Sequence, residues 1–246
     1  MVAEISPDWA ALSPVSALAQ LASSSAGVER AAIKRAERIM LGVTPELIAS
    51  GAPLVIGVDE AGRGPLAGPV VAAAVVLGAA IPAGLDDSKR LSPARRAVLD
   101  EAIRAGCGWA VAVVDPEEID RLNIFMATMH AMTRAVAALA AALRCETREV
   151  LIDGNLTPHG RCAEWRWHAR AIVGGDGIEP CISAASIIAK EWRDRMMLEA
   201  AAAHPHYAWE RNKGYGTAEH MEALRRHGPS PLHRRSFAPV SQLVLI

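Results

Sequence analysis

Carboxylates stand at the ends of three apolar, strand-like runs of this chain. They are Asp59 with Glu60, Asp153 and Asp176. Because functional sites of α/β proteins assemble at strand ends, carboxylates from neighbouring strands could converge on one patch that needs a cation. Oxygen ligands without Cys or His favour Mg²⁺ or Mn²⁺ over zinc. Two such ions, about 4 Å apart, can bind the attacking water and the leaving oxygen in phosphodiester hydrolysis.

Two of these acids are adjacent, which limits how they can act together. Successive residues of a strand point to opposite faces, so Asp59 and Glu60 share a site only if the strand breaks there. We expect Ala61–Gly64 to supply that break. Asp153 is followed by Gly154, and Asp-Gly is a common turn dipeptide. On spacing alone, Asp153 is therefore the weakest candidate among the four acids.

Glycines and cations elsewhere could bind a sugar-phosphate backbone. In Gly62-Arg63-Gly64 the glycines permit a close approach of the main chain and the arginine offers a guanidinium for a phosphate. Lys89 and Lys190 add cations that could bind phosphates. Tyr215 lies between two glycines beside Lys213 and could stack on a sugar or base. A turn tyrosine packed on the core explains Tyr215 equally well.

The elements that would position these residues alternate along the chain. We expect helices over Ile124–Leu143, Ile182–Ala203 and Ala218–His227, and another that begins with Ser92 as N-cap and Pro93 at its first position. The expected strands are Leu54–Val58, Val70–Leu77, Trp109–Val114, Glu149–Asp153 and Ala171–Val173. The pattern predicts an α/β fold, a mixed five-stranded sheet flanked by helices, in which the first three strands form an antiparallel meander.

The chain of 246 residues fits one large domain with appendages. Residues 1–50 are rich in Ala and Ser, are compatible with helix near 15–22 and 28–41, and carry no strand signal. We expect them to form a partly helical or flexible N-terminal extension. The catalytic core would span 51–203, and 204–246 would form a small C-terminal helical region and tail.

Charge and cysteine content narrow the class of protein. With 26 basic and 27 acidic residues, no global positive field attracts nucleic acid, so a polyanion site must be local. Residues 190–246 hold nine basic against six acidic residues. The four scattered cysteines and the lack of a signal-peptide pattern favour the cytoplasm. Glycines and prolines interrupt the uncharged run 67–85, so we expect no membrane span, and we expect a monomer.

Six blocks of the sequence, in order, resemble bacterial ribonuclease HII. They are Asp59–Leu77, Asp87–Ser92, Ile152–Gly154, Ser183–Lys190 with Arg193–Arg195, Lys213–Thr217 with His220, and His233–Phe237. The resemblance covers about 55–240 and implies a ribonuclease-H-like fold. It also implies an endonuclease that hydrolyses the RNA strand of RNA–DNA hybrids. Such an enzyme also nicks 5′ of ribonucleotides embedded in duplex DNA, leaving 3′-OH and 5′-phosphate ends, in ribonucleotide excision repair.

The resemblance assigns the metal site to the acids named above. Asp59, Glu60, Asp153 and Asp176 match the four carboxylates that hold two Mn²⁺ or Mg²⁺ ions in the family. One departure lies close by, because Ile178-Glu179 stands where many relatives carry Lys-Ser. That change removes one expected phosphate contact and adds a carboxylate.

The resemblance also implies substrate contacts. Gly62-Arg63-Gly64 would contact the 2′-OH of the ribonucleotide and the adjacent phosphate, and Tyr215 would pack on the deoxyribose 3′ to it. Together they would recognise an RNA-to-DNA junction. Lys89, Asn123 and Lys190 match phosphate contacts.

Two other functions are compatible with parts of this sequence. Ribonuclease HIII shares the fold but usually carries Gly-Lys-Gly in the first loop and a larger N-terminal substrate-binding domain, which Gly62-Arg63-Gly64 and the short N-terminal segment argue against. A catalytically inactive hybrid-binding module is the other alternative, and retention of all four carboxylates argues against it.

The C-terminal tail, Gln242–Ile246, resembles the short peptides that dock into bacterial sliding clamps, with Ile in place of the usual Phe. The alternative is a tail packed on the core. The sequence therefore offers a sliding clamp as a further partner.

Overall fold

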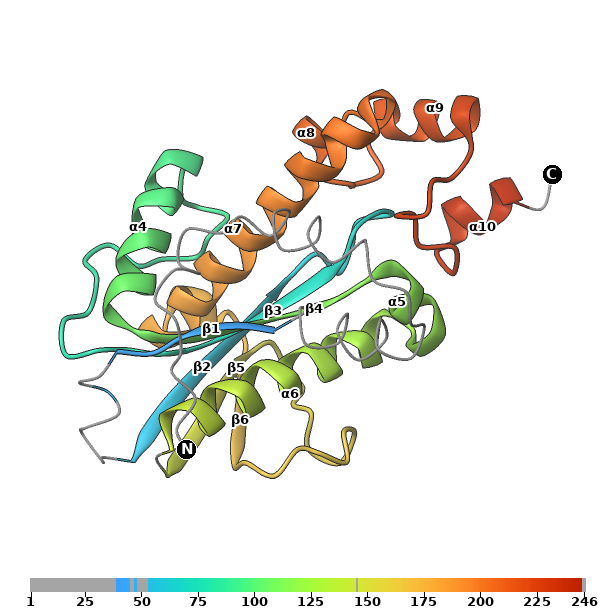
Figure 1. Cartoon of the computed structure of the whole chain (residues 1–246). Helices are drawn as coiled ribbons and strands as arrows, with labels where there is room; N and C mark the ends of the chain where they lie inside the picture. Colours follow the sequence, from blue (N-terminus) through green and yellow to red (C-terminus); the bar gives the residue numbers. More distant parts are fainter. Residues whose placement is uncertain (1–38, 45–46, 48–52, 145, 245–246) are drawn as a thin grey trace, which may run out of the picture. The chain divides into compact units, whose positions relative to one another are not determined.

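The computed structural model describes residues 39–44, 47, 53–144 and 146–244, which contain a mixed six-stranded sheet of order β1-β4-β3-β2-β5-β6 (Figure 1). The strands are β1 (Ile39–Gly42), β2 (Leu54–Ala61), β3 (Val70–Val76), β4 (Gly108–Val114), β5 (Thr147–Asp153) and β6 (Ala169–Ile172). The α/β class and the five expected strands are confirmed. As predicted, β2, β3 and β4 form an antiparallel meander, whereas β2–β5 and β5–β6 pair in parallel.

The sixth strand is the element that sequence reasoning missed. The segment 28–41 was expected to be compatible with helix and to carry no strand, and this is wrong at its end, where β1 pairs antiparallel with β4. Four apolar residues are too few to show an alternating pattern, and pairing with an existing sheet edge decides their conformation. The remaining residues of the expected extension, up to 38, lie outside the described part, and the domain boundaries at 50 and 203 stay predictions.

Helices cover both faces of the sheet (Figure 1). They are α4 (Pro93–Gly106), α5 (Pro116–Leu122), α6 (Ile124–Leu143), α7 (Pro180–Ala203), α8 (Trp209–Asn212), α9 (Ala218–His227) and α10 (Ala238–Val244), with short 3₁₀ turns η2 (Gly175–Gly177) and η3 (Pro205–Tyr207). The expected N-cap of α4 is confirmed, because Ser92 Oγ accepts a hydrogen bond from Arg95 N at 3.3 Å. The expected bounds of α6 and α9 agree with the structure, and α7 begins two residues earlier than expected.

The central strands are buried on both faces, which explains their unbroken apolar sequence. Alternate residues of β3 and β4, such as Ala72 and Ala112, pack towards α6. The intervening residues, such as Val71 and Val111, pack towards α4 and α7. On the α7 face, a Cβ at Gly57 would lie 2.2 Å from the main chain of Cys181. Glycine at this position therefore lets the start of α7 approach β2 closely.

Helix α6 is long and apolar enough by composition to cross a membrane, but half of its most apolar stretch is buried inside the protein. Its residues Ala131, Val136 and Leu139 belong to the main apolar cluster against the sheet. It is therefore a core helix of this fold. The uncharged run 67–85 contains β3 and the loop that follows it, in line with the sequence prediction.

The C-terminal helices gather beyond the end of the sheet to which β2 points (Figure 1). An apolar cluster that includes Tyr207, Trp209 and Leu224 packs them on Leu66 and on the second half of α7. The contact continues through the main chain, because Leu66 N donates to Gly214 O at 2.8 Å. This packing brings the loop 213–217 to the loop that follows β2.

Candidate active site

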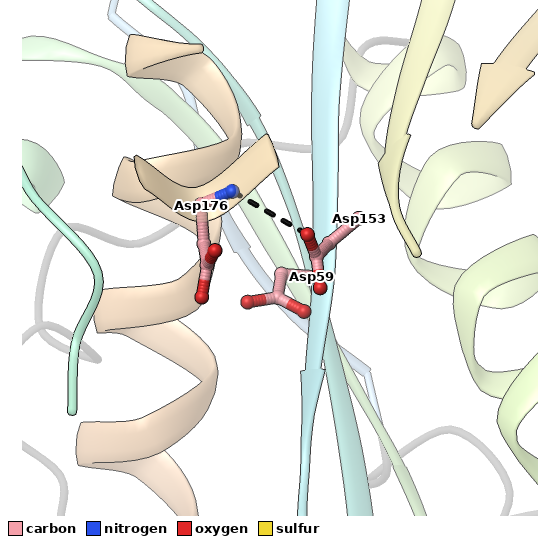
Figure 2. Close-up of side chains that lie close together, drawn as sticks. All are labelled: Asp59, Asp153 and Asp176. Atoms are coloured by element: carbon pink, nitrogen blue, oxygen red, sulfur yellow. Dashed lines mark hydrogen bonds between the residues drawn. The ribbon is translucent and has the colours of Figure 1, made fainter. Parts of the chain in front are cut away.

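Strand register brings two of the predicted acids together. Val58 pairs with Ile152 across the parallel strands β2 and β5, so Asp59 and Asp153 are the next residues on each strand and project from the same face. Asp176 lies in η2, between β6 and the start of α7. One carboxylate oxygen from each of the three aspartates lies within 4.8 Å of the others, and the side chains point towards one another (Figure 2).

Local hydrogen bonds fix the main chain around this group. Asp176 N donates a long hydrogen bond to Asp153 Oδ1, at 3.4 Å (Figure 2). Ser183, in the first turn of α7, donates its hydroxyl to the carbonyl of Asp176 at 2.5 Å. Asp59 Oδ1 accepts from Glu60 N at 2.7 Å. The serine therefore ties the irregular turn of Asp176 to a helix that is itself packed on β2.

The electrostatics of the group favour a bound cation. Burial raises the pKa of Asp59 well above its usual value, and the charges of Glu60 and Asp153 raise it further. Burial and the charge of Asp153 also raise the pKa of Asp176. Ionised carboxylates in such a group repel one another, and a divalent cation relieves that repulsion. Three hard oxygen donors without His or Cys fit Mg²⁺ or Mn²⁺.

The course of β2 separates Glu60 from the three aspartates. Strand β2 continues through Asp59 and Glu60 and ends at Ala61, where the expected break begins, so the two adjacent acids are still in the strand and point to opposite faces. Glu60 is outside the group of three aspartates and lines a cleft, where its Oε1 lies 3.4 Å from Arg63 Nη1. Burial raises the pKa of Glu60, and the Arg63 guanidinium offsets part of that rise.

The cleft has a volume of about 470 Å³ and collects most of the predicted substrate contacts. Gly62-Arg63-Gly64, Lys89, Lys190 and Tyr215 line it together with Glu60. Asn123 does not line it and instead caps α6, where its side chain accepts from Met126 N at 3.0 Å. As a phosphate contact Asn123 stays a prediction.

Tyr215 lies beside the loop after β2 in the lining of the cleft. Its side chain is 47% exposed, and its Cε1 would lie 3.6 Å from a Cβ placed on Gly64. Gly214, next to it, has φ +85° and would bring a Cβ within 2.5 Å of the carbonyl oxygen of Ala67. Tyr215 is therefore an exposed ring on a constrained turn, and the alternative of a core-packed tyrosine does not describe it.

The two predicted lysines differ in their surroundings. Lys89 Nζ is exposed and lies 3.8 Å from Asp176 Oδ2. Partial burial lowers the pKa of Lys89, but the carboxylates around it, Asp87 first, raise it overall. Lys190 Nζ donates to both carboxylate oxygens of Asp194, at 2.6 and 2.7 Å. Asp194 thus serves as an ion-pair partner of Lys190 on α7.

Four further residues of the cleft were not singled out from the sequence: Ser88, Arg96, Ser186 and Arg193. Ser186 Oγ donates to Ser88 Oγ at 2.8 Å, and both hydroxyls are buried. Ser88, Ser186 and Arg193 lie inside the sequence blocks that resemble the family, which was the only available signal. Their chemistry as single residues is too common to identify a site.

Comparison with known proteins gives a consistent result. A family model described as Ribonuclease HII matches residues 56–240. The ribonuclease HII of Erythrobacter litoralis is 69% identical over 82% of this chain and 98% of its own length. The ribonuclease HII of Novosphingobium aromaticivorans is 72% identical over 78% of this chain and all of its own length.

Solved structures share the fold. The ribonuclease HII of the PCNA:RNase HII complex from Archaeoglobus fulgidus is 27% identical with a TM-score of 0.61, over 77% of this chain and 96% of that one. Bst-RNase HIII in complex with Mn²⁺ is 23% identical with a TM-score of 0.67, over 82% of this chain and 73% of that one. The expected ribonuclease-H-like fold is confirmed.

Proposed function

The chain belongs to the ribonuclease HII family of metal-dependent ribonucleases H, and we propose that it cuts the RNA strand of RNA–DNA hybrids and nicks duplex DNA 5′ of embedded ribonucleotides. The products would carry 3′-OH and 5′-phosphate ends. The observation that supports this proposal is the position of three clustered aspartates beside a cleft lined by Gly62-Arg63-Gly64 and Tyr215. By the family resemblance, Gly62-Arg63-Gly64 and Tyr215 would together recognise the RNA-to-DNA junction.

Asp59, Asp153 and Asp176 are the residues that would hold the ions, with Glu60 as the fourth carboxylate at the edge of the group. When bound, two Mg²⁺ or Mn²⁺ ions would supply the positive charge that activates a water and stabilises the leaving oxygen. The relative Bst-RNase HIII has been solved with Mn²⁺. The oxygen-only donor set of this chain fits either ion.

The remaining residues of the cleft would bind and orient the nucleic acid. Gly64 leaves room for the sugar of the ribonucleotide to approach the main chain, where a backbone group can bond the 2′-OH. A Cβ at Gly62 would instead meet Arg193 Nε at 2.1 Å, so this glycine allows the loop to pack on Arg193. The exposed guanidinium of Arg63 and the ammonium of Lys89 would bind the phosphates on either side. The ring of Tyr215 would pack on the next sugar, and only a deoxyribose leaves space for that contact.

The test uses a short duplex DNA with a single ribonucleotide and a matched duplex without one. We expect nicking 5′ of the ribonucleotide with Mg²⁺ or Mn²⁺, none after chelation with EDTA, and none of the all-DNA duplex. Asp153→Asn is the matched control, because it keeps the size of a cluster residue and removes its charge. Cleavage of the all-DNA duplex, or full activity of Asp153→Asn, would contradict the proposal.

A sliding clamp is proposed as a partner through Gln242–Ile246. The Archaeoglobus fulgidus relative has been solved with PCNA, and in this chain Gln242 at the end of α10 is exposed. Leu243 packs partly on the C-terminal apolar cluster, so docking would have to release this side chain. Removal of residues 242–246 should abolish retention of the protein by an immobilised bacterial clamp while nicking of a short duplex continues. No retention of the full chain would exclude the partner.

A further inference from the structure

The last block that resembles the family, His233–Phe237, has no part in the chemistry proposed above. Its first residues run beside the segment that leaves the Gly62-Arg63-Gly64 loop. Ala67 and His233 form an antiparallel bridge, and Gly68 N donates to Leu232 O at 2.8 Å. Arg234 N donates to Leu66 O at 2.9 Å. The C-terminal region is thus joined by main-chain hydrogen bonds to the loop that borders the cleft.

From this position the side chain of Arg234 reaches back under the loop. Its guanidinium is fully buried and donates only to carbonyl oxygens. Nη2 bonds Gly62 O at 2.6 Å and Pro69 O at 3.1 Å, Nη1 bonds Arg63 O at 2.9 Å, and Nε bonds Gly68 O at 2.9 Å. One side chain therefore holds both ends of the loop, and two of its four partners are residues that line the cleft.

Further contacts hold the guanidinium of Arg234 and the main chain that follows it. Its Cζ lies 5.1 Å from the ring centroid of Phe237, a cation–π contact. Asp120, on α5, accepts from the main-chain N of Arg235 at 2.9 Å and of Ser236 at 2.9 Å. The block His233–Phe237 thereby docks on the core at the residues next to Arg234, and little freedom is left for its side chain.

Burying the charged guanidinium of Arg234 costs free energy of folding. No ion pair of Arg234 occurs among the described residues, and burial, then the nearby Arg193, lower the pKa of Arg234 to about 9. A buried guanidinium without an ion-pair partner depends chiefly on its hydrogen bonds, although the charge of Asp120 offsets part of the fall in its pKa. Apolar side chains often stabilise a fold better at such a position. Only a planar group with several donors can bond carbonyls at both ends of one loop. The arrangement fits a loop that must keep one conformation.

We propose that Arg234 is a positioning residue of the active site, which acts through Gly62 and Arg63 and holds their loop in the conformation that receives the ribonucleotide. The inference rests on the proposed function of that loop. Arg234 does not itself reach the substrate. Arg193 supports the same loop further along the chain. It is also buried, and it donates to Ala67 O at 3.1 Å and to Pro69 O at 3.0 Å.

The test is a double-mutant cycle of Arg234→Lys and Arg63→Ala, with single-turnover cleavage of a one-ribonucleotide duplex and of an RNA–DNA hybrid. A lysine cannot bond four carbonyls, so Arg234→Lys should slow cleavage by about 10- to 100-fold. If it acts through the loop, the same change should cost at least threefold less once the Arg63 side chain is gone. Losses that multiply in full in the double variant would overturn the proposal.

Two controls separate positioning from general stability. Arg134→Lys alters a half-buried arginine outside the cleft, which donates to Glu118 of α5 at 2.6 and 3.1 Å. It should lower the melting temperature without coupling to Arg63→Ala. If Arg234→Lys does not fold, Phe237→Leu removes the ring behind the guanidinium and should give a smaller loss with the same coupling.

The two substrates keep the proposals apart. If the unaltered chain cleaves the hybrid but does not cleave the one-ribonucleotide duplex, the proposed nicking at embedded ribonucleotides is refuted and the proposed cleavage of hybrids is not. The cycle measured on the hybrid would then still decide the role of Arg234. If Arg234→Lys cleaves both substrates as fast as the unaltered chain, the positioning role of Arg234 is refuted and the proposed function of the protein is unaffected.

Discussion

His220 and His233 face each other in the C-terminal region, with Nε2 atoms 3.1 Å apart and both rings buried. Their partners define the proton positions. Ser230 N donates to His233 Nδ1, so His233 carries its proton on Nε2 and donates it to His220. His220 Nε2 also accepts from Trp209 Nε1, and His220 Nδ1 therefore donates to Tyr215 O at 2.9 Å. The turn of Tyr215 is thus held by two neutral imidazoles.

The first prediction is a loss of stability in mild acid. Burial, then the neighbouring His220, lower the pKa of His233 to about 4, and burial lowers the pKa of His220. An unfolded chain protonates histidine below about pH 6.5, so this contribution to stability is complete above that pH and falls as the pH drops towards the folded value. Between about pH 7.5 and 5, His233 should account for roughly 2 kcal/mol of lost unfolding free energy.

Urea unfolding at both pH values, with metal removed, measures this loss. The raised pKa values of Asp59 and Asp176 also make stability depend on pH. The comparison is therefore with His233→Gln, which should lose less stability on acidification than the unaltered chain. His159→Gln replaces an exposed histidine and should follow the unaltered chain. An equal pH dependence for His233→Gln would contradict the assignment of neutral, buried rings.

The second prediction concerns Asp59. Its pKa is raised by burial and by neighbouring acids, so its charged form destabilises the fold and its contribution to stability declines as the pH rises through the folded pKa. Asp59→Asn should therefore stabilise the metal-free protein near neutral pH but have little effect near pH 4. Its cleavage rate should fall by at least about 100-fold, because a metal ligand contributes several kcal/mol. Thermal melts at both pH values and a nicking assay measure the two effects.

The cluster of aspartates proposed to bind metal was largely predictable from the sequence because its members lie at or beyond the ends of strands. Asp59 and Asp153 follow apolar runs, and once two parallel strands are in register such residues must lie side by side. Asp176 was found in the same way, although it lies in a 3₁₀ turn beyond β6. The position of Glu60 was not predictable, since it depends on how far β2 continues along β3.

Contacts between distant segments escaped sequence reasoning for a physical reason. Arg234 is surrounded by polar residues and reads as a surface arginine, yet it is fully buried against carbonyls more than 160 positions earlier in the chain. Every residue has a main-chain carbonyl, so the residue types of the sequence do not reveal which carbonyls Arg234 contacts. The strand β1 escaped for a similar reason, because its conformation comes from the exposed edge of β4.

The third prediction concerns how much of the N-terminus can be removed without loss of activity or stability. A chain that begins at Arg38 keeps β1 and should cleave within about tenfold of the full rate, a difference of about 1.4 kcal/mol in barrier. A chain that begins at Ser50 loses β1 and the buried Leu47, and should unfold with roughly 2–4 kcal/mol less free energy. It would also expose an edge of β4 that invites aggregation. Urea unfolding and nicking rates of both chains test this, and equal stability would show that β1 contributes little.

The fourth prediction separates junction recognition from general nuclease activity, and it depends on the exposed ring of Tyr215 beside Gly64. Tyr215→Ala removes a stacking contact typically worth about 1–3 kcal/mol, or about 5- to 150-fold in kcat/KM on a one-ribonucleotide duplex. A long hybrid offers no deoxyribose at that position, so its cleavage should suffer less. Tyr215→Phe keeps the ring and should behave like the unaltered chain, whereas Arg63→Ala should weaken both reactions. Equal losses on both substrates for Tyr215→Ala would mean that the ring supports binding in general, because a junction contact cannot act where no junction exists.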